Sequence, residues 1–167
     1  MPHHRLLSTP TMRIADPRDA RAICAMPSAG RWRHVKEASS SLRAAALSLG
    51  GEQAQARETN VLLFEIDREI AAAAALRQAT EADLSQLITL MLHQEMRGCH
   101  LREQPREPLC VVVLDATMRF AADNGFRRMA AHIAHADRKG LRLAQRAGFA
   151  CVGHADREHG VWAVSLR

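Results

Sequence analysis

Apolar and polar positions in the middle of the chain follow the pattern of strands. Residues 61–66 are rich in leucine, aromatic and β-branched side chains, and Asp67-Arg68 separates them from a second apolar run over 69–76. Two such runs around a two-residue polar turn predict an antiparallel hairpin. The second run holds an alanine stretch that would suit a helix, but directly after a tight turn its small side chains favour a strand that a neighbour approaches closely. The apolar run over 84–92 predicts the next strand.

The flanking regions carry the signals of helices. Asp16-Pro17 supplies an N-cap and a proline at the first helical position, and Asn124-Gly125 ends a helix that begins near residue 109. The remaining elements are predicted as strands over 12–15, 129–133, 151–152 and 161–166, and as helices over 18–26, 32–49, 109–123 and 138–147. This order predicts one α/β domain over residues 11–167, with a mixed central sheet of about six to seven strands flanked by about four helices. Residues 1–10 show no periodicity and are expected to be a flexible N-terminal tail.

Length and composition are those of an ordinary globular protein. The 167 residues suit a single domain with a substantial core. Every apolar run is far shorter than the roughly 18–20 residues that a membrane span needs, and the start of the chain lacks the apolar segment of a secretory signal. The four cysteines show no CxxC spacing, which favours a reducing compartment, and we therefore expect a cytoplasmic protein without a membrane partner.

The charge is positive and comes almost entirely from arginine. The net charge is +5, and Lys36 and Lys139 are the only lysines among 23 basic residues. The planar guanidinium suits phosphate and carboxylate groups, so a nucleotide-like ligand would fit this surface; a composition-biased genome would explain the arginines equally well. We find no DNA-recognition motif and expect no nucleic-acid partner, although a basic nucleic-acid binder stays a third alternative with steep salt dependence.

Three separated fragments of the chain form one pattern through their residues, their order and their spacing. Met12-Arg13-Ile14-Ala15 precedes Asp19-Ala20, the strand over 84–92 runs into Arg97-Gly98, and Asp137 leads to Gly148-Phe149. In this order and spacing they resemble the GNAT superfamily of acyl-CoA-dependent N-acyltransferases over nearly the whole chain. The resemblance implies acetyl-CoA, or another acyl-CoA, as cosubstrate.

The resemblance also implies where the cosubstrate binds. The family holds its pyrophosphate on the backbone N–H groups of a glycine-rich loop at a helix start. The implied contacts here are main-chain groups of Leu90, Met91 and Leu92, the loop residues Arg97, Gly98, Cys99, His100 and Arg102, and Asp137. Beyond Gly98 the loop lacks glycine and is about eight residues longer than in the family. Either arginine side chains replace the backbone contacts, or the loop is a solvated excursion that binds no acyl-CoA.

The implied acyl transfer needs a base for the amine and a proton for the thiolate. The family's tyrosine acid falls on Ala144, and the chain contains no tyrosine. Candidate bases are His93 at the strand exit, Glu95, and His132 on the strand over 129–133, because histidine titrates near neutrality. His132 and His135 do not show a recognised zinc spacing, so we expect no metal.

Together these features predict an N-acyltransferase, most simply an N-acetyltransferase. It would move an acyl group from acyl-CoA to an amine on a small molecule or a protein, and a homodimer is compatible with this activity. The alternative is a GNAT-fold binding or regulatory module with weak or no catalysis, acting through the arginine-rich loop.

Overall fold

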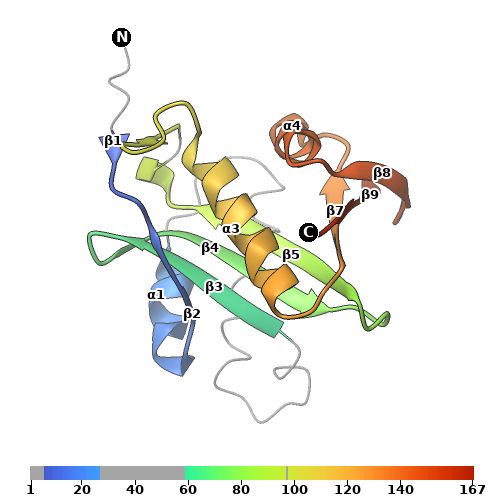
Figure 1. Cartoon of the computed structure of the whole chain (residues 1–167), viewed down its shortest axis with the longest axis horizontal. Coiled ribbons are helices and arrows are strands. Elements are labelled where there is room, and N and C mark those ends of the chain that lie inside the picture. Colours follow the sequence, from blue (N-terminus) through green and yellow to red (C-terminus); the bar gives the residue numbers. More distant parts are fainter. Residues whose placement is uncertain (1–5, 27–58, 97) are drawn as a thin grey trace.

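A seven-stranded mixed sheet forms the centre of the molecule (Figure 1). The computed structural model describes residues 6–26, 59–96 and 98–167, so the helix predicted over 32–49 lies outside the described residues. The sheet has the order β2-β3-β4-β5-β7-β9-β8, and β5 and β7 are its parallel pair. Its strands are β2 Thr11–Ile14, β3 Thr59–Ile66, β4 Glu69–Gln78, β5 Leu84–Leu92, β7 Arg128–Ala134, β8 Ala150–His154 and β9 His159–Ser165.

Helices cover both faces of this sheet (Figure 1). One face carries α3, Leu109–Asp123, and α4, Arg138–Arg146. The other carries the 3-10 helix η1, Pro17–Asp19, and α1, Ala20–Ala25. A second 3-10 helix, η3 Gln94–Met96, follows β5 directly. Among the described residues, no helix combines the length and the apolarity needed to cross a membrane.

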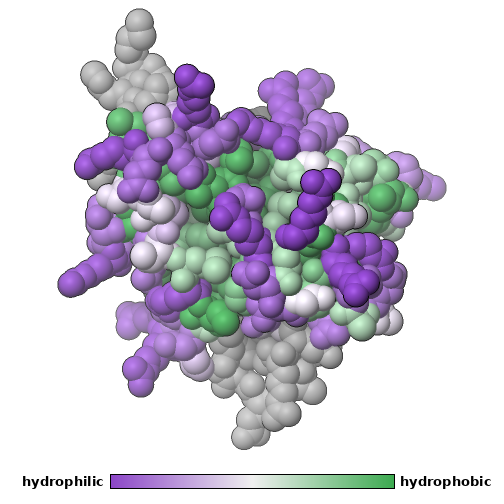
Figure 2. Space-filling model, viewed as in Figure 1, coloured by the Kyte–Doolittle hydropathy of each residue, from purple (hydrophilic) through white to green (hydrophobic). Residues whose placement is uncertain are grey.

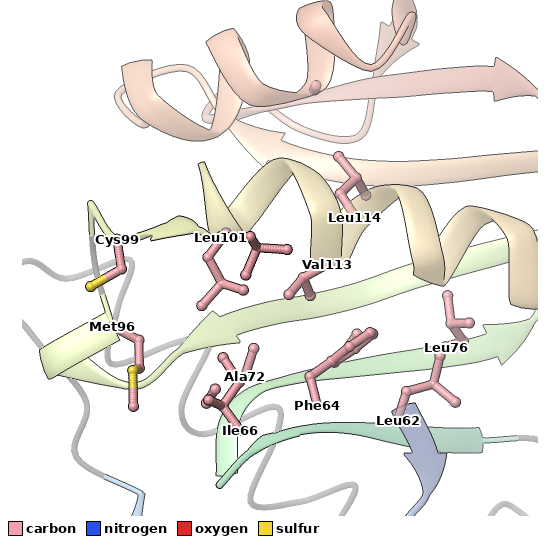
Figure 3. Close-up of a cluster of buried hydrophobic side chains, with 14 of the residues drawn as sticks. Leu62, Phe64, Ile66, Ala72, Leu76, Met96, Cys99, Leu101, Val113 and Leu114 are labelled. Atoms are coloured by element: carbon pink, nitrogen blue, oxygen red, sulfur yellow. The ribbon is translucent and has the colours of Figure 1, made fainter. Parts of the chain in front are cut away.

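Two buried clusters hold these layers together. The larger one lies between the sheet and α3, where Val113 of α3 points toward Phe64 of β3 (Figure 3). Leu62 and Ile66 of β3 and Leu114 of α3 belong to the same cluster. The smaller one lies on the opposite face and packs Ile23 of α1 against Leu63 of β3 and Met91 of β5. Apolar burial on both faces explains why β3 and β4 read as nearly continuous hydrophobic runs.

The alanine run is a strand, as predicted. All five alanines over 71–75 are fully buried in β4, between β3 and β5. The turn before it places Asp67 and Arg68 at φ 52° and 69°, the left-handed conformation of a two-residue hairpin turn. Tight pairing with β3 on one side and β5 on the other outweighs the helix propensity of alanine.

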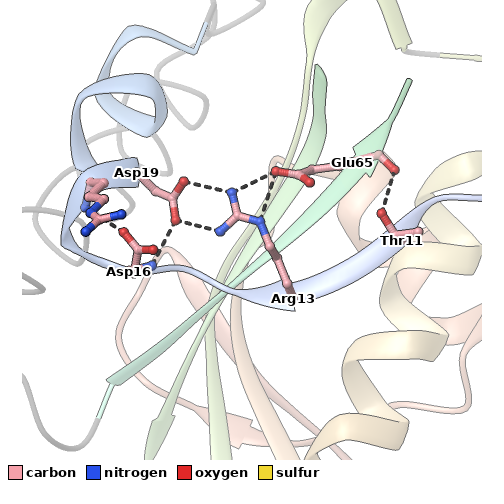
Figure 4. Close-up of polar contacts among 6 residues, drawn as sticks. Thr11, Arg13, Asp16, Asp19 and Glu65 are labelled. Carbon is pink, nitrogen blue, oxygen red and sulfur yellow. Dashed lines mark hydrogen bonds and ion pairs between the residues drawn. The ribbon is translucent and has the colours of Figure 1, made fainter. Parts of the chain in front are cut away.

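Ion pairs made by Arg13 hold the edge strand β2 against β3 and η1. Arg13 of β2 bonds Asp19 of η1 at 2.7 Å and Glu65 of β3 at 2.7 Å (Figure 4). Asp16 completes a capping box with Asp19 at the start of η1. The hydrogen bond from Arg13 lowers the pKa of Asp19 and keeps this carboxylate charged.

The structure corrects one expectation and refines another. Residues 1–10 were expected to be a flexible tail, but Leu6–Leu7 forms β1, which pairs in parallel with β6, His100–Leu101. Leu7 is buried in the larger core cluster. Two residues show no periodicity in a sequence, and their partner lies far along the chain. The predicted helix over 18–26 begins as the 3-10 turn η1 and becomes α-helical only at Ala20.

Candidate active site

The two parallel strands at the centre of the sheet separate along their length. Pairing between β5 and β7 runs from Leu84 opposite Arg128 to Leu87 opposite Ala131, and both strands continue beyond that point without pairing to each other. Leu87 lies opposite Leu76 of β4 and Thr89 opposite Ala75, so Ile88 is an extra residue in β5. Such a β-bulge bends its strand. The bulge thus lies where β5 leaves β7.

A pocket of about 410 Å³ occupies this gap. Its walls are residues 87–90 of β5 and 131–134 of β7, and Leu114 of α3 closes one side. The opposite side consists of Gly140, Leu143 and Ala144 of α4, with Phe149 behind them. The result is a largely apolar slot between α3 and α4, with the size of a small-molecule site.

The pocket touches groups from both faces of the sheet. Ala131 belongs to the core cluster under α3 and α4, so alternation along β7 places His132 and Ala134 on the opposite face. Thr89 lies across from Ala75, which packs on the α1 side. Apart from Asp137 at the start of α4, the slot is therefore apolar toward α3 and α4, and Thr89 and His132 are on the α1 face.

Thr89 places a buried hydroxyl group at the wall of this slot. The residue is 6% exposed, and its Oγ1 has no hydrogen-bond partner among the described residues. Burying a hydroxyl without a partner is unfavourable. A ligand group in the pocket would satisfy it, as donor or as acceptor.

The hairpin turn between β8 and β9 adds an ordered pair of titratable groups. Asp156 and His159 both line the pocket, and His159 Nδ1 lies 3.0 Å from each carboxylate oxygen of Asp156. The hydrogen bond to His159, with a further one from the Glu158 backbone, lowers the pKa of Asp156. Asp156 and His159 are not among the site residues predicted from the sequence; the available signal is an aspartate three residues before a histidine in a hairpin turn.

Asp137 and Gly140 form the start of α4 at the pocket wall. Asp137 caps the helix, with Oδ1 accepting the Gly140 N–H at 2.9 Å. A Cβ on Gly140 would collide with the same carboxylate. The two residues therefore depend on each other, because the carboxylate folds over the space that glycine leaves free. Ala144, where the resemblance places a tyrosine, is buried and also lines the pocket.

The loop between β5 and α3 is closed by its own backbone. The two ends of this loop meet at Cys99 and Leu109, where the Leu109 N–H donates to the Cys99 carbonyl at 3.0 Å. His100 bridges to Pro108, and the Arg102 N–H donates to Leu7 of β1 at 2.7 Å. The Val111 N–H donates to the Pro108 carbonyl. At least two N–H groups in the first turn of α3 are therefore already used, which reduces what this helix start offers an anion.

The structure brings some of the predicted site residues together. Leu90, His132 and Asp137 line the pocket. The side chain of Met91 packs on the α1 side and that of Leu92 on the α3 side, while the prediction for both concerned their main-chain groups. Gly98 has φ 72°, Cys99 is buried, and no described residue of the loop over 98–102 lines the pocket. Arg97 lies outside the described residues.

The candidate bases are placed differently from one another. His93 follows β5, and its Nδ1 accepts the Glu95 N–H at 3.3 Å. Glu95 is exposed in η3. Neither lines the pocket, whereas His132 does. In the described part of the chain, no three His, Cys, Asp or Glu side chains are arranged to hold a metal ion.

Comparison with known proteins identifies the fold. No protein-family model and no curated protein matches the chain. An acetyltransferase assigned to the GNAT family from Desulfovibrio desulfuricans superposes with a TM-score of 0.72 at 14% identity, covering 95% of this chain and 99% of that one.

Two further solved structures agree. The PaiA N-acetyltransferase of Thermoplasma acidophilum in complex with coenzyme A gives a TM-score of 0.65 at 10% identity, over 94% of this chain and 99% of that one. A spermidine N-acetyltransferase SpeG chimera from Vibrio cholerae and hSSAT gives 0.68 at 12% identity, over 95% and 96%. The chain has the GNAT fold, which confirms the predicted α/β class and the mixed sheet.

Proposed function

We propose that the protein is an N-acyltransferase that moves an acyl group, most simply acetyl, from acyl-CoA to an amine. One observation carries the proposal: the pocket between the diverging strands β5 and β7, which touches groups from both faces of the sheet. A thioester entering between α3 and α4 would meet an amine approaching from the α1 face. Holding both reactants in one slot supplies much of the advantage of catalysis.

The chain fits the thioester end of acyl-CoA. Beyond Leu87 and Ala131, the edges of β5 and β7 that face each other carry main-chain groups outside the strand pairing. An extended amide-containing arm would pair with such groups as a strand does. The apolar walls at Leu114 and Leu143 suit its methylene groups, and the Thr89 hydroxyl supplies a polar contact.

The diphosphate of acyl-CoA would be bound by positively charged arginine side chains. The N–H groups of Leu109 and Val111 already donate to carbonyls, while Arg102 and Arg106 are exposed on the excursion just before α3. We assign the diphosphate to these arginines, with Arg97 as a third member from the sequence. Arginine binds phosphate through paired, charge-assisted hydrogen bonds.

The acceptor is proposed to be a small molecule or a protein with a primary amine. Acceptors then include polyamines, because a spermidine N-acetyltransferase shares this fold. The described cysteines Cys99, Cys110 and Cys151 are free thiols, which supports a reducing, cytoplasmic location.

Calorimetry and an acceptor screen test this proposal. Acetyl-CoA and desulfo-CoA are titrated into the protein, and acetyl transfer is then measured with polyamines, aminoglycosides and lysine peptides. We expect micromolar binding and turnover of at least one amine. Ala144→Trp, which fills the slot, should abolish binding, and Ala150→Trp on exposed β8 is the matched control. No binding at millimolar acetyl-CoA, or equal binding by both variants, would refute the proposal.

A second function is favoured by the loop itself. The backbone closure at Cys99 and Leu109, together with alanine at the position of the family's acid, is what a non-catalytic binding module would show. Such a module would bind acyl-CoA, or another anion, without turning over any amine. Binding without transfer across the acceptor panel would select this alternative.

A further inference from the structure

The Asp156–His159 pair has the geometry of an oriented base. Asp156 Oδ1 accepts the backbone N–H groups of Glu158 and His159 at 2.7 and 2.8 Å, which fixes the carboxylate. Both carboxylate oxygens lie 3.0 Å from His159 Nδ1. A carboxylate at Nδ1 holds the proton there and leaves the lone pair of Nε2 free to accept another.

The Asp156–His159 pair lies at the end of the slot where β5 and β7 no longer pair. His159 is opposite Ala134 in the β7–β9 register, beyond the last pairing of β5 with β7. Directly opposite residues share a face of the sheet, so His159 lies on the same α1 face as Thr89 and His132. Its side chain is 28% exposed, partly withdrawn from water but reachable from the pocket.

No other described histidine combines these two properties. His93 receives a backbone N–H on its Nδ1 and does not line the pocket. His132 lines the pocket, but among the described residues no carboxylate contacts it. His135 and His154 stack edge to face against each other. Access to the slot and an orienting carboxylate coincide at His159.

We propose that His159, oriented by Asp156, is the general base of acyl transfer in this protein; the inference rests on the proposed function. Nε2 takes a proton from the amine nitrogen as that nitrogen forms its bond to the thioester carbon. The C–S bond then breaks, and the thiolate takes the proton back from the imidazolium, directly or through water. The products are an amide and the free thiol, with no other reactant consumed. One residue thus serves both proton transfers in a chain without tyrosine.

Other titratable and charged groups surround His159. They are Asp156, Arg157 and Glu158 of its own turn, His132 and His135 on and just after β7, and Asp137 at the start of α4. His132 lines the same pocket and carries the same imidazole group as His159. A His132→Gln background therefore separates its contribution to any pH profile from that of His159.

The test is kinetic, with a structural readout beside it. In His159→Gln, we expect kcat to fall about 10²- to 10⁴-fold, the acidic limb of its pH profile to disappear, and acetyl-CoA affinity measured by calorimetry to stay within about twofold of wild type. In Asp156→Asn, kcat should fall roughly tenfold, which corresponds to the loss of about one hydrogen bond to a charged group. The acidic limb of its pH profile should move to lower pH. His154→Gln, in the same hairpin, should match wild type.

Each result decides between distinct outcomes. An active wild type whose pH profile survives His159→Gln overturns the base and leaves the proposed function standing. A parallel loss of acetyl-CoA affinity in His159→Gln shows a structural role and also overturns it. A wild type that acetylates no amine overturns the proposed function and the base together. By ¹⁵N NMR, the neutral His159 ring should carry its proton on Nδ1; a proton on Nε2 contradicts the proposal.

Discussion

The two ends of the candidate site, the gap between β5 and β7 and the start of α3, differ in what they offer a ligand. At the β5–β7 gap there is a largely apolar pocket of about 410 Å³, and the Thr89 hydroxyl that borders it has no hydrogen-bond partner among the described residues. At the start of α3, the Cys99 carbonyl accepts the Leu109 N–H, and the next residues, His100–Leu101, pair with Leu6–Leu7. One end has the shape of a ligand site, while at the other end backbone N–H groups of α3 already donate to protein carbonyls.

The difference follows from what each end is made of. The gap arises from strand direction and a bulge at Ile88, that is, from backbone geometry that many side chains allow. A diphosphate loop depends on glycine at particular positions, because a Cβ blocks the approach of the phosphates. Here a single glycine, Gly98, remains in the loop before α3. Hydrophilic residues lie over this side of the molecule between hydrophobic areas (Figure 2), and Arg102 and Arg106 of the loop before α3 are exposed.

The largest expected effect tests whether these arginines bind the diphosphate. Arg102→Ala combined with Arg106→Ala should weaken coenzyme A binding about 10- to 100-fold, since each charge-assisted hydrogen bond contributes about 1.5–3 kcal/mol before partial compensation. Binding of S-acetylpantetheine, which lacks the diphosphate, should not change. Calorimetry at two salt concentrations measures both. Arg119→Ala, on the exposed side of α3 beside Asp115, is the control. Equal weakening for both ligands would show that the arginines act on the pocket and not on the diphosphate.

A second variant tests the pocket end. Gly140→Ala should destabilise the protein by about 0.5–2 kcal/mol, because the new Cβ displaces the Asp137 carboxylate from its cap. Gly153→Ala is the matched control, since nothing lies near its Cβ and its φ is ordinary. Urea unfolding measures the free energy of unfolding of each. If Gly140→Ala is as stable as wild type, the cap does not fasten this wall of the pocket.

Most of the fold could be predicted from the sequence, and the reasons are local. Apolar period and the Asn124-Gly125 stop predict the helix over 109–123, which α3 matches, and the run over 84–92 matches β5. The turn residues Asp67-Arg68 predict the β3–β4 hairpin and so override the helix propensity of its alanines. These features depend on neighbours in the chain.

The site could be predicted only in part, because it depends on distant neighbours. Leu90, His132 and Asp137 line the pocket, and the roles expected for them there stay predictions. The bulge at Ile88 is not visible, because it exists only relative to β4. The Asp156–His159 pair was missed for the same reason: the turn brings the two together, but only the β7–β9 register places them at the slot.

Smaller effects are expected for variants of two buried threonines, Thr89 and Thr117. Thr89→Val should raise the free energy of unfolding by about 1 kcal/mol, because it removes a buried hydroxyl that has no partner within the described part of the chain. Thr117→Val should lower it by about 1 kcal/mol, because Thr117 Oγ1 donates to the Val113 carbonyl at 2.7 Å. If Thr89 serves a ligand, its variant should also bind acetyl-CoA more weakly. Two variants that both destabilise would show that the Thr89 hydroxyl has a partner.

The smallest expected effect lies outside both ends and provides a baseline for them. The pKa of Asp19 is held below its ordinary value of 3.8 by the hydrogen bond from Arg13. A carboxylate with a lowered pKa in the folded state adds stability that is present above its unfolded pKa and is lost as pH falls through the folded one. Asp19→Asn should therefore reduce the free energy of unfolding at pH 7 by no more than about 1 kcal/mol and flatten its decline in acid. Acetyl-CoA affinity should not change. A loss of affinity would mean that the β2 edge is coupled to the pocket, and that the two ends of the site cannot be treated as independent of the rest of the sheet.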